Sequence, residues 1–95
     1  MKLNSDQIEC LDLYGIPKHM QGGIIRFYES GIPPGHFLTA VIDNDLRGAI
    51  ERADDENIHL LKNYVQWFYN HAPSGSWGHA GSTRRWCQDF ERESA

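Results

Sequence analysis

The sequence predicts an all-α fold, a compact bundle of four to five short helices. Apolar residues recur at spacings of three and four along almost the whole chain, and clusters of Pro and Gly interrupt that pattern at a few points. A chain of 95 residues is near the length at which one core is adequate. We therefore expect a single helical domain over residues 1–95.

The first two expected helices cover residues 5–15 and 17–31. Pro17 suits the first position of the second helix, because its fixed φ is helical and its missing N–H is not needed there. Gly22 and Gly23 lie inside the second helix, where each costs about 1 kcal/mol relative to Ala. This cost predicts that another helix or a ligand approaches the backbone closely at the glycine pair.

The GIPPG sequence at residues 31–35 predicts a turn, after which a third helix begins. Its apolar stripe continues to Ala53, either in one helix or in two with a restart at Asp43 or Asn44. The longest helix should start at Asp54 or Asp55, and its apolar circumference is wide enough to predict a central position or burial against a second subunit. We therefore expect a homo-oligomer. The two apolar flanks of this helix are Ile58, Leu61, Val65 and Phe68, and Leu60, Tyr64 and Trp67.

Residues 70–81, NHAPSGSWGHAG, predict a loop that is long for so small a domain. The tail then resumes helical spacing through Trp86 and Phe90. We expect a final short helix there, which begins near Ser82 and frays at Ser94.

Composition narrows the class of protein. A net charge of -4 argues against general binding to nucleic acid, which requires a basic face. The N-terminal sequence has no apolar signal core, and no segment approaches the roughly 18 apolar residues of a membrane span. We expect a cytoplasmic protein without a membrane segment, in which Cys10 and Cys87 are reduced thiols.

The acidic run from Asp43 to Asp54 resembles a calcium-binding loop only in part. Asp45 and Gly48 would fill positions 3 and 6 of such a loop, and Asp54 position 12. Position 5 is Arg47, a cation where a ligand should be, and Asp at position 12 is one methylene shorter than the usual Glu. We expect these acidic residues to cap helices and not to bind a metal.

The sequence favours neither a metal site nor an enzyme. No two histidines have the i, i+4 spacing of a helical zinc site, and the two cysteines fit no short metal spacing. No segment has the signature of an activated nucleophile. We therefore expect no metal, no cofactor and no catalytic residue. The histidines are His19, His36, His59, His71 and His79.

The loop over residues 70–81 is a candidate anion site together with the start of the following helix. Its glycines can present backbone N–H groups, Arg84 adds positive charge, and Trp77 offers a face for stacking on a planar base. In the alternative interpretation the loop is only a connector, Trp77 fills an apolar slot, and Arg85 pairs with Asp89 at i, i+4.

A second candidate cluster consists of His19, Arg26 and Arg52. Arg26 follows His19 by two helical turns, so both can lie on one face, and Arg52 would come from a neighbouring helix. In the alternative interpretation the arginines form a structural network with acidic side chains. These would be Asp45, Glu51 and Asp54.

Two stretches of the sequence carry a resemblance, IPKHMQGGIIRFYESGIPPGHFLTAVIDNDLRGAIERADDEN (residues 16–57) and YNHAPSGSWG (residues 69–78). They resemble small proteins encoded by bacteriophages and prophages. The fragments that carry the likeness are Pro17 to Met20, Arg26, Pro34 to Leu38, Asn44 to Leu46, Arg52 to Asp54, and Pro73 to Gly78.

The resemblance implies a phage accessory protein that acts in the host bacterial cytoplasm and counters host defence. The leading hypothesis is non-enzymatic sequestration of a nucleotide-derived immune signalling molecule. Two alternatives stay open: an inhibitor or regulator that binds a bacterial host defence protein, and a small enzyme that degrades such a signal. The expected ligand contacts are His19, Arg26, Asn44, Asp45, Arg52, Trp77 and Arg84.

Overall fold

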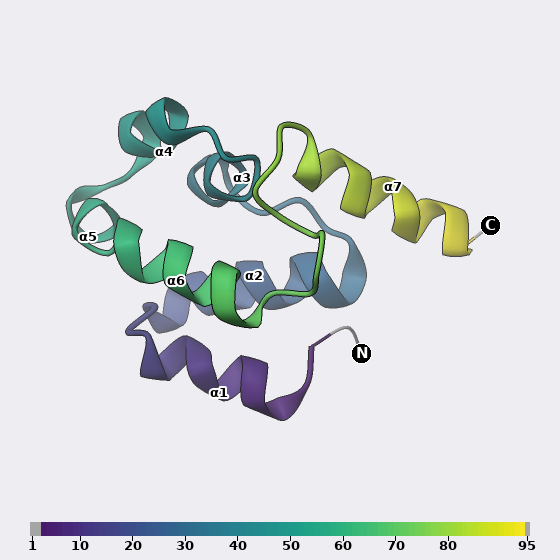
Figure 1. Cartoon of the computed structure of the whole chain (residues 1–95), viewed down its shortest axis with the longest axis horizontal. Coiled ribbons are helices and arrows are strands. Elements are labelled where there is room, and N and C mark those ends of the chain that lie inside the picture. Colours follow the sequence, from purple (N-terminus) through teal and green to yellow (C-terminus); the bar gives the residue numbers. More distant parts are fainter. Residues whose placement is uncertain (1–2, 95) are drawn as a thin grey trace.

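Short helices connected by tight turns make up nearly all of the chain. The computed structural model describes residues 3–94, which contain seven helices and no strand (Figure 1). Their Cα radius of gyration, 12.5 Å, is that of a folded domain of this length. The all-α prediction is therefore confirmed. The helices are α1 (Ser5–Leu13), α2 (Lys18–Ser30), α3 (His36–Ile42), α4 (Leu46–Arg52), α5 (Asp55–His59), α6 (Leu61–His71) and α7 (Ser82–Ser94).

The predicted number of four to five helices is wrong, because two expected helices are each divided in two. Asn44, at φ 59°, adopts the left-handed conformation that ends α3, and Asp45 then caps α4 by accepting the Gly48 N–H at 3.0 Å. Asp54 caps α5 in the same way, through the Asn57 N–H at 2.7 Å. The division after α5 falls at Leu60, where no Gly or Pro marks it in the sequence.

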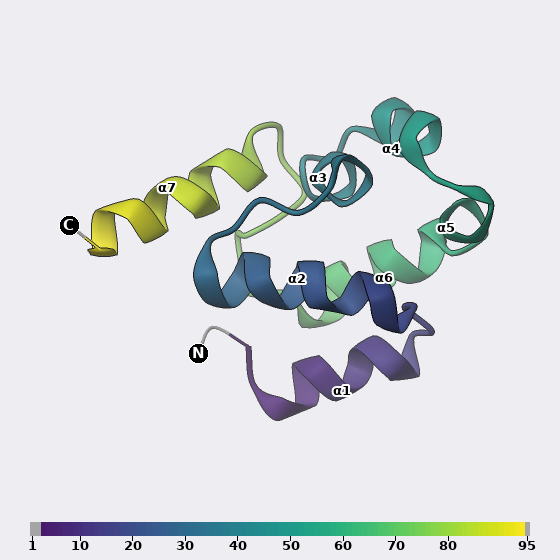
Figure 2. The same cartoon turned by 180° about the vertical axis from the view of Figure 1, so that it is seen from behind.

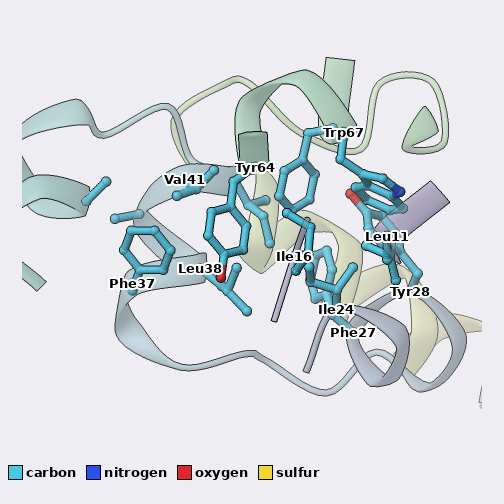
Figure 3. Close-up of a cluster of buried hydrophobic side chains, with 14 of the residues drawn as sticks. Leu11, Ile16, Ile24, Phe27, Tyr28, Phe37, Leu38, Val41, Tyr64 and Trp67 are labelled. Carbon is cyan, nitrogen blue, oxygen red and sulfur yellow. The ribbon is translucent and has the colours of Figure 1, made fainter. Parts of the chain in front are cut away.

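One core joins the helices. Figure 3 shows side chains from α1, α2, α3 and α6 meeting in a single cluster, with Tyr64 and Trp67 of α6 among them. Trp67 is fully buried and makes an edge-to-face contact with Phe68 at 5.1 Å between ring centroids. Figure 2 shows α2 between α1 and the pair formed by α3 and α4. α6 is thus central to the core, as its wide apolar circumference predicts.

Indole hydrogen bonds fix the outer helices on this core. The Trp67 Nε1–H donates to the Gln7 carbonyl at 3.0 Å, and the Gln7 side-chain amide donates to the His71 carbonyl, so α1 is held along α6. The Trp86 Nε1–H donates to the Phe27 carbonyl at 2.8 Å and holds α7 on α2. Each bond pairs a polar group that burial would otherwise leave unsatisfied.

The predicted close approach of another helix at Gly22 and Gly23 is wrong within the described chain. A Cβ on Gly23 would lie 3.5 Å from a Leu38 methyl, an ordinary contact. A Cβ on Gly22 would meet only the mobile end of the Arg26 side chain, at 3.0 Å. The packing of residues 3–94 therefore does not require glycine at either position.

Ala substitutions at Gly23 and Gly31 should have opposite effects. Gly23→Ala should raise the free energy of unfolding by up to about 1 kcal/mol, because helix propensity improves without a clash. Gly31→Ala should lower it by more than about 1 kcal/mol, because Gly31 has φ +66° and its Cβ would lie 2.5 Å from the Phe90 ring. Urea denaturation of both variants measures the two changes. Destabilisation by Gly23→Ala would show that this site is packed more tightly than the distances indicate.

Candidate functional site

An apolar hollow opens between α4 and α6, and we call it the α4–α6 groove. α4 packs against α3, and α5 connects it to α6 (Figure 1). The groove has a volume of about 110 Å³. Ala40 and Val41 of α3 lie at its base with Trp77 of the long loop. Its lining residues are Ala40, Val41, Asn44, Asp45, Leu46, Ala49, Leu61, Val65 and Trp77.

The loop over residues 72–81 holds Trp77 in place. The Gly78 N–H donates to the Ile42 carbonyl at the end of α3, at 2.7 Å. A 3.0 Å hydrogen bond joins the buried Ser76 hydroxyl to the Tyr28 hydroxyl of α2. One face of the indole lies against Phe68, with ring centroids 5.7 Å apart and planes tilted by 30°. Trp77 is therefore a fixed part of the groove, with one of its faces already covered.

Large apolar side chains are exposed on the two helices that border the groove, and two of them, Leu46 and Val65, line it. Leu46 and Ile50 on α4 are 66% and 49% exposed, and Val65 and Tyr69 on α6 are 40% and 78% exposed. Each pair has i, i+4 spacing, so it forms a stripe along its helix. Ile50 and Tyr69 do not line the groove but extend these stripes by one helical turn, and we call the two stripes the apolar ridges of α4 and α6.

A second, more polar hollow adjoins the groove. It has a volume of about 500 Å³, and backbone of the long loop forms most of its lining. Asn44 and Trp77 line both hollows, and the polar one also includes His79. A site of this kind combines an apolar slot with a few polar groups beside it.

The structure brings three of the predicted contact residues together and leaves the other four elsewhere. Asn44, Asp45 and Trp77 all line the α4–α6 groove. His19, on α2, lies 3.6 Å from a Glu56 carboxylate oxygen. The remaining arginines lie outside the linings of the groove and the polar hollow. They are Arg26 on α2, Arg52 at the end of α4, and Arg84 in α7.

The acidic residues proposed as partners of these arginines have other partners. Glu51 pairs with Arg47 at 3.0 Å, and Asp45 and Asp54 cap helices. Among the side chains of residues 3–92, no carboxylate lies within 4.0 Å of the guanidinium groups of Arg26 or Arg52. Both arginines are exposed and available to a ligand or a partner.

The start of α7, predicted as an anion site, carries a carboxylate of the chain itself. Asp43 accepts the Thr83 backbone N–H at 2.8 Å, and this bond links the end of α3 to α7. Arg84 lies in a separate hollow of about 410 Å³ with Asp43 and Glu91, where these carboxylates oppose a bound anion. Arg85 donates to the Ala80 carbonyl at 3.0 Å and Asp89 lies 3.9 Å from Arg92, so the Arg85–Asp89 pair of the alternative interpretation is not formed.

The acidic run has the capping role that the sequence predicts, although not at every expected residue. Asp45 and Asp54 cap helices, whereas Asp43 ends α3 and binds α7. A Cβ on Gly48 would overlap the Asp45 carboxylate, which explains glycine at this position without a metal. In the described part of the chain, no group of three or more His, Cys, Asp or Glu is placed to hold a metal ion.

Removal of the Asp45 cap should destabilise the protein, and calcium should not change its stability. Asp45→Ala should lower the free energy of unfolding by about 1 kcal/mol, because the Gly48 N–H loses its acceptor, and Asp45→Asn should restore most of this loss. Thermal unfolding with and without millimolar calcium measures both effects. A calcium-dependent rise in Tm that Asp45→Ala abolishes would instead identify a metal site.

Several residues of the predicted apolar stripes lie outside the core. Leu46, Ile50 and Val65 fall in the predicted apolar stripes, yet all three are exposed. The core side of α6 consists of Tyr64, Trp67 and Phe68. The signal that could have revealed this was the excess of apolar residues around the long predicted helix, more than one core face requires.

Comparisons of the chain with protein-family models, with curated proteins and with solved structures gave no match. Among the described residues, no helix combines the length and the apolar character needed to cross a membrane.

Proposed function

We propose that this chain is a non-enzymatic binding protein that docks on another protein through the α4–α6 groove. In the setting implied by its resemblance to phage proteins, the partner is a bacterial host defence protein in the cytoplasm, which the chain inhibits or regulates. The observation that carries the proposal is the pair of exposed apolar ridges on α4 and α6, with Trp77 between them.

Exposed apolar side chains gathered around a slot are typical of protein–protein interfaces. Single exposed apolar residues are normal on a protein surface, but a contiguous patch marks an interaction site. The most strongly bound residues of interfaces are large side chains that fill central pockets and lose contact with water. A partner can cover Leu46, Ile50 and Tyr69 in this way, because about half or more of each residue is exposed.

The positions of the arginines favour a protein partner over a nucleotide. Phosphate groups are best recognised by arginines, which bind their oxygens in a bidentate geometry. Arg26, Arg52 and Arg84 lie outside the groove and the polar hollow, so one copy of the chain presents no arginine to a phosphate beside Trp77. The apolar ridges beside the groove suit a partner's side chains better than a phosphorylated ligand.

Affinity capture from bacterial lysate tests the proposal. The tagged chain should retain one host protein at a constant molar ratio, and no small molecule should be needed for the complex. A Leu13→Gln, Ile32→Gln double variant should behave like the natural sequence, because both residues are exposed but neither lies on α4 or α6. Capture of no host protein would contradict the proposal. Capture by the Leu46→Gln, Ile50→Gln variant that is as strong as capture by the natural sequence would contradict it too.

Sequestration of a nucleotide-derived signal is the second candidate function. It is favoured by the polar hollow that adjoins Trp77 and by the unpaired arginines Arg26 and Arg52. A homo-oligomer would be needed for arginines of one copy to approach Trp77 of another. Arg26→Ala or Arg52→Ala should then abolish binding with Tm nearly unchanged, and repeated turnover of the molecule would indicate an enzyme instead.

A further inference from the structure

The α4–α6 groove has the form of a site for a helix. Resting on the function proposed above, we propose that its occupant is an amphipathic α-helix of the partner protein. The apolar stripe of this helix lies on Trp77 between the ridges of α4 and α6, and a Lys or Arg side chain lies at the end that faces α5.

The geometry of the walls supports a helical occupant. Leu46 and Ile50 follow each other along α4, and Val65 and Tyr69 along α6, each pair one helical turn apart. A helix with apolar residues at i, i+3, i+4 and i+7 has the spacing to fit between such ridges, as in known helix-in-groove complexes. The described chain has no strand, so an extended peptide would find no free strand edge with which to pair.

The charges beside the groove support a basic residue on the occupant. α5 connects α4 to α6 at one end of the groove (Figure 1), and its start carries the carboxylates of Asp54, Asp55 and Glu56. Asp54 accepts the Asn57 N–H and Glu56 lies 3.6 Å from His19, so these two carboxylates already have partners. Asp55 is exposed, and no cation lies within 4.0 Å of its carboxylate in the described chain.

A second copy of the chain fits the groove less well than a foreign helix. The apolar face of α7 is already engaged, because Trp86 packs on Phe27 and Tyr28 of α2. The apolar side of α6 that carries Tyr64 and Trp67 is buried in the core.

Selection from a display library of random 16-residue peptides tests this inference, with the folded chain as the target. Peptides that bind should carry apolar residues at i, i+3 or i+4, and i+7, together with Lys or Arg near one end. Binding of a selected peptide should weaken at least 100-fold for Leu46→Gln, Ile50→Gln. It should weaken about 3- to 10-fold for Asp55→Asn, and the effect of Asp55→Asn should shrink in high salt.

The outcomes separate the inference from the function on which it rests. Selected peptides that are acidic or rich in Pro, but that still lose binding in the groove variant, would overturn the helical occupant and leave a protein-binding groove. Selection of no peptide would overturn the inference as well. So would selection only of peptides that bind the natural sequence and the Leu46→Gln, Ile50→Gln variant equally. A dimer in light scattering that Val65→Glu dissociates would show that a second copy is the occupant. Failure of the proposed function itself would appear in lysate capture.

Discussion

The Leu46→Gln, Ile50→Gln double variant should lose partner binding by at least about 100-fold. Both side chains are exposed in the free chain and would be buried in the complex, and burial of a Leu or Ile side chain stabilises by about 1.5–3 kcal/mol. Gln at either position leaves the partner's apolar surface against an amide group. A loss of about 3–4 kcal/mol for the pair corresponds to a change in Kd of more than 100-fold.

The matched control separates a lost contact from a lost fold. Leu13→Gln, Ile32→Gln makes the same chemical change at exposed sites on α1 and in the turn before α3. Circular dichroism and thermal unfolding should show both double variants within about 0.5 kcal/mol of the natural sequence, because surface substitutions rarely change stability by more. If the control loses the partner as completely as the groove variant, the α4–α6 groove is not the docking surface.

Trp67→Ala should unfold a large fraction of the protein. Trp67 is completely buried, packs on Phe68 and donates its Nε1–H to the Gln7 carbonyl, so its removal leaves a cavity and breaks this link between α6 and α1. Such a truncation costs about 3–5 kcal/mol. This is a large share of the total of about 5–15 kcal/mol that holds a domain together. Urea denaturation followed by circular dichroism measures the change.

Tyr69→Ala is the comparison for this prediction. Tyr69 is on the same helix, but most of its surface faces solvent. Its truncation should change the free energy of unfolding by less than about 0.5 kcal/mol. A cost of less than about 1 kcal/mol for Trp67→Ala would mean that α6 is not the centre of the core.

The fold class and most helix limits follow from the sequence because their signals are local. Turn residues and helical spacing suffice to define α1, α2 and α7 to within a few residues. Gly31 shows why: at φ 66° it closes α2 with its own N–H bonded to the Phe27 carbonyl. These features depend on residues a few positions apart.

Of the two divisions within the longer helices, the sequence pattern includes the one at Asn44 as an alternative and does not indicate the one at Leu60. Asn44 breaks the third expected helix where the loop docks on α3, since the Gly78 N–H bonds to Ile42. The break at Leu60 has no Gly, Pro or side-chain cap to mark it. Helical spacing alone cannot show which apolar residues face the core, so Leu46 and Val65 were placed inside it.

The candidate site was predicted in part. Asn44, Asp45 and Trp77 were singled out for their residue types, and the fold brings all three to one groove. The sequence does not show where Arg26 and Arg52 lie relative to the groove, because their positions depend on how α2 and α4 are oriented around α3. The sequence pattern identifies the residues of the ridges as apolar, but it does not show that they are exposed.

Native mass spectrometry of the chain purified from bacterial lysate tests the binding account most directly, because it weighs whatever the protein retains. The proposal predicts a complex whose mass is that of one host protein plus the chain, and its loss for Leu46→Gln, Ile50→Gln. An oligomer of the chain that carries a small-molecule mass, with no host protein, would contradict a protein partner and support sequestration of a nucleotide-derived signal.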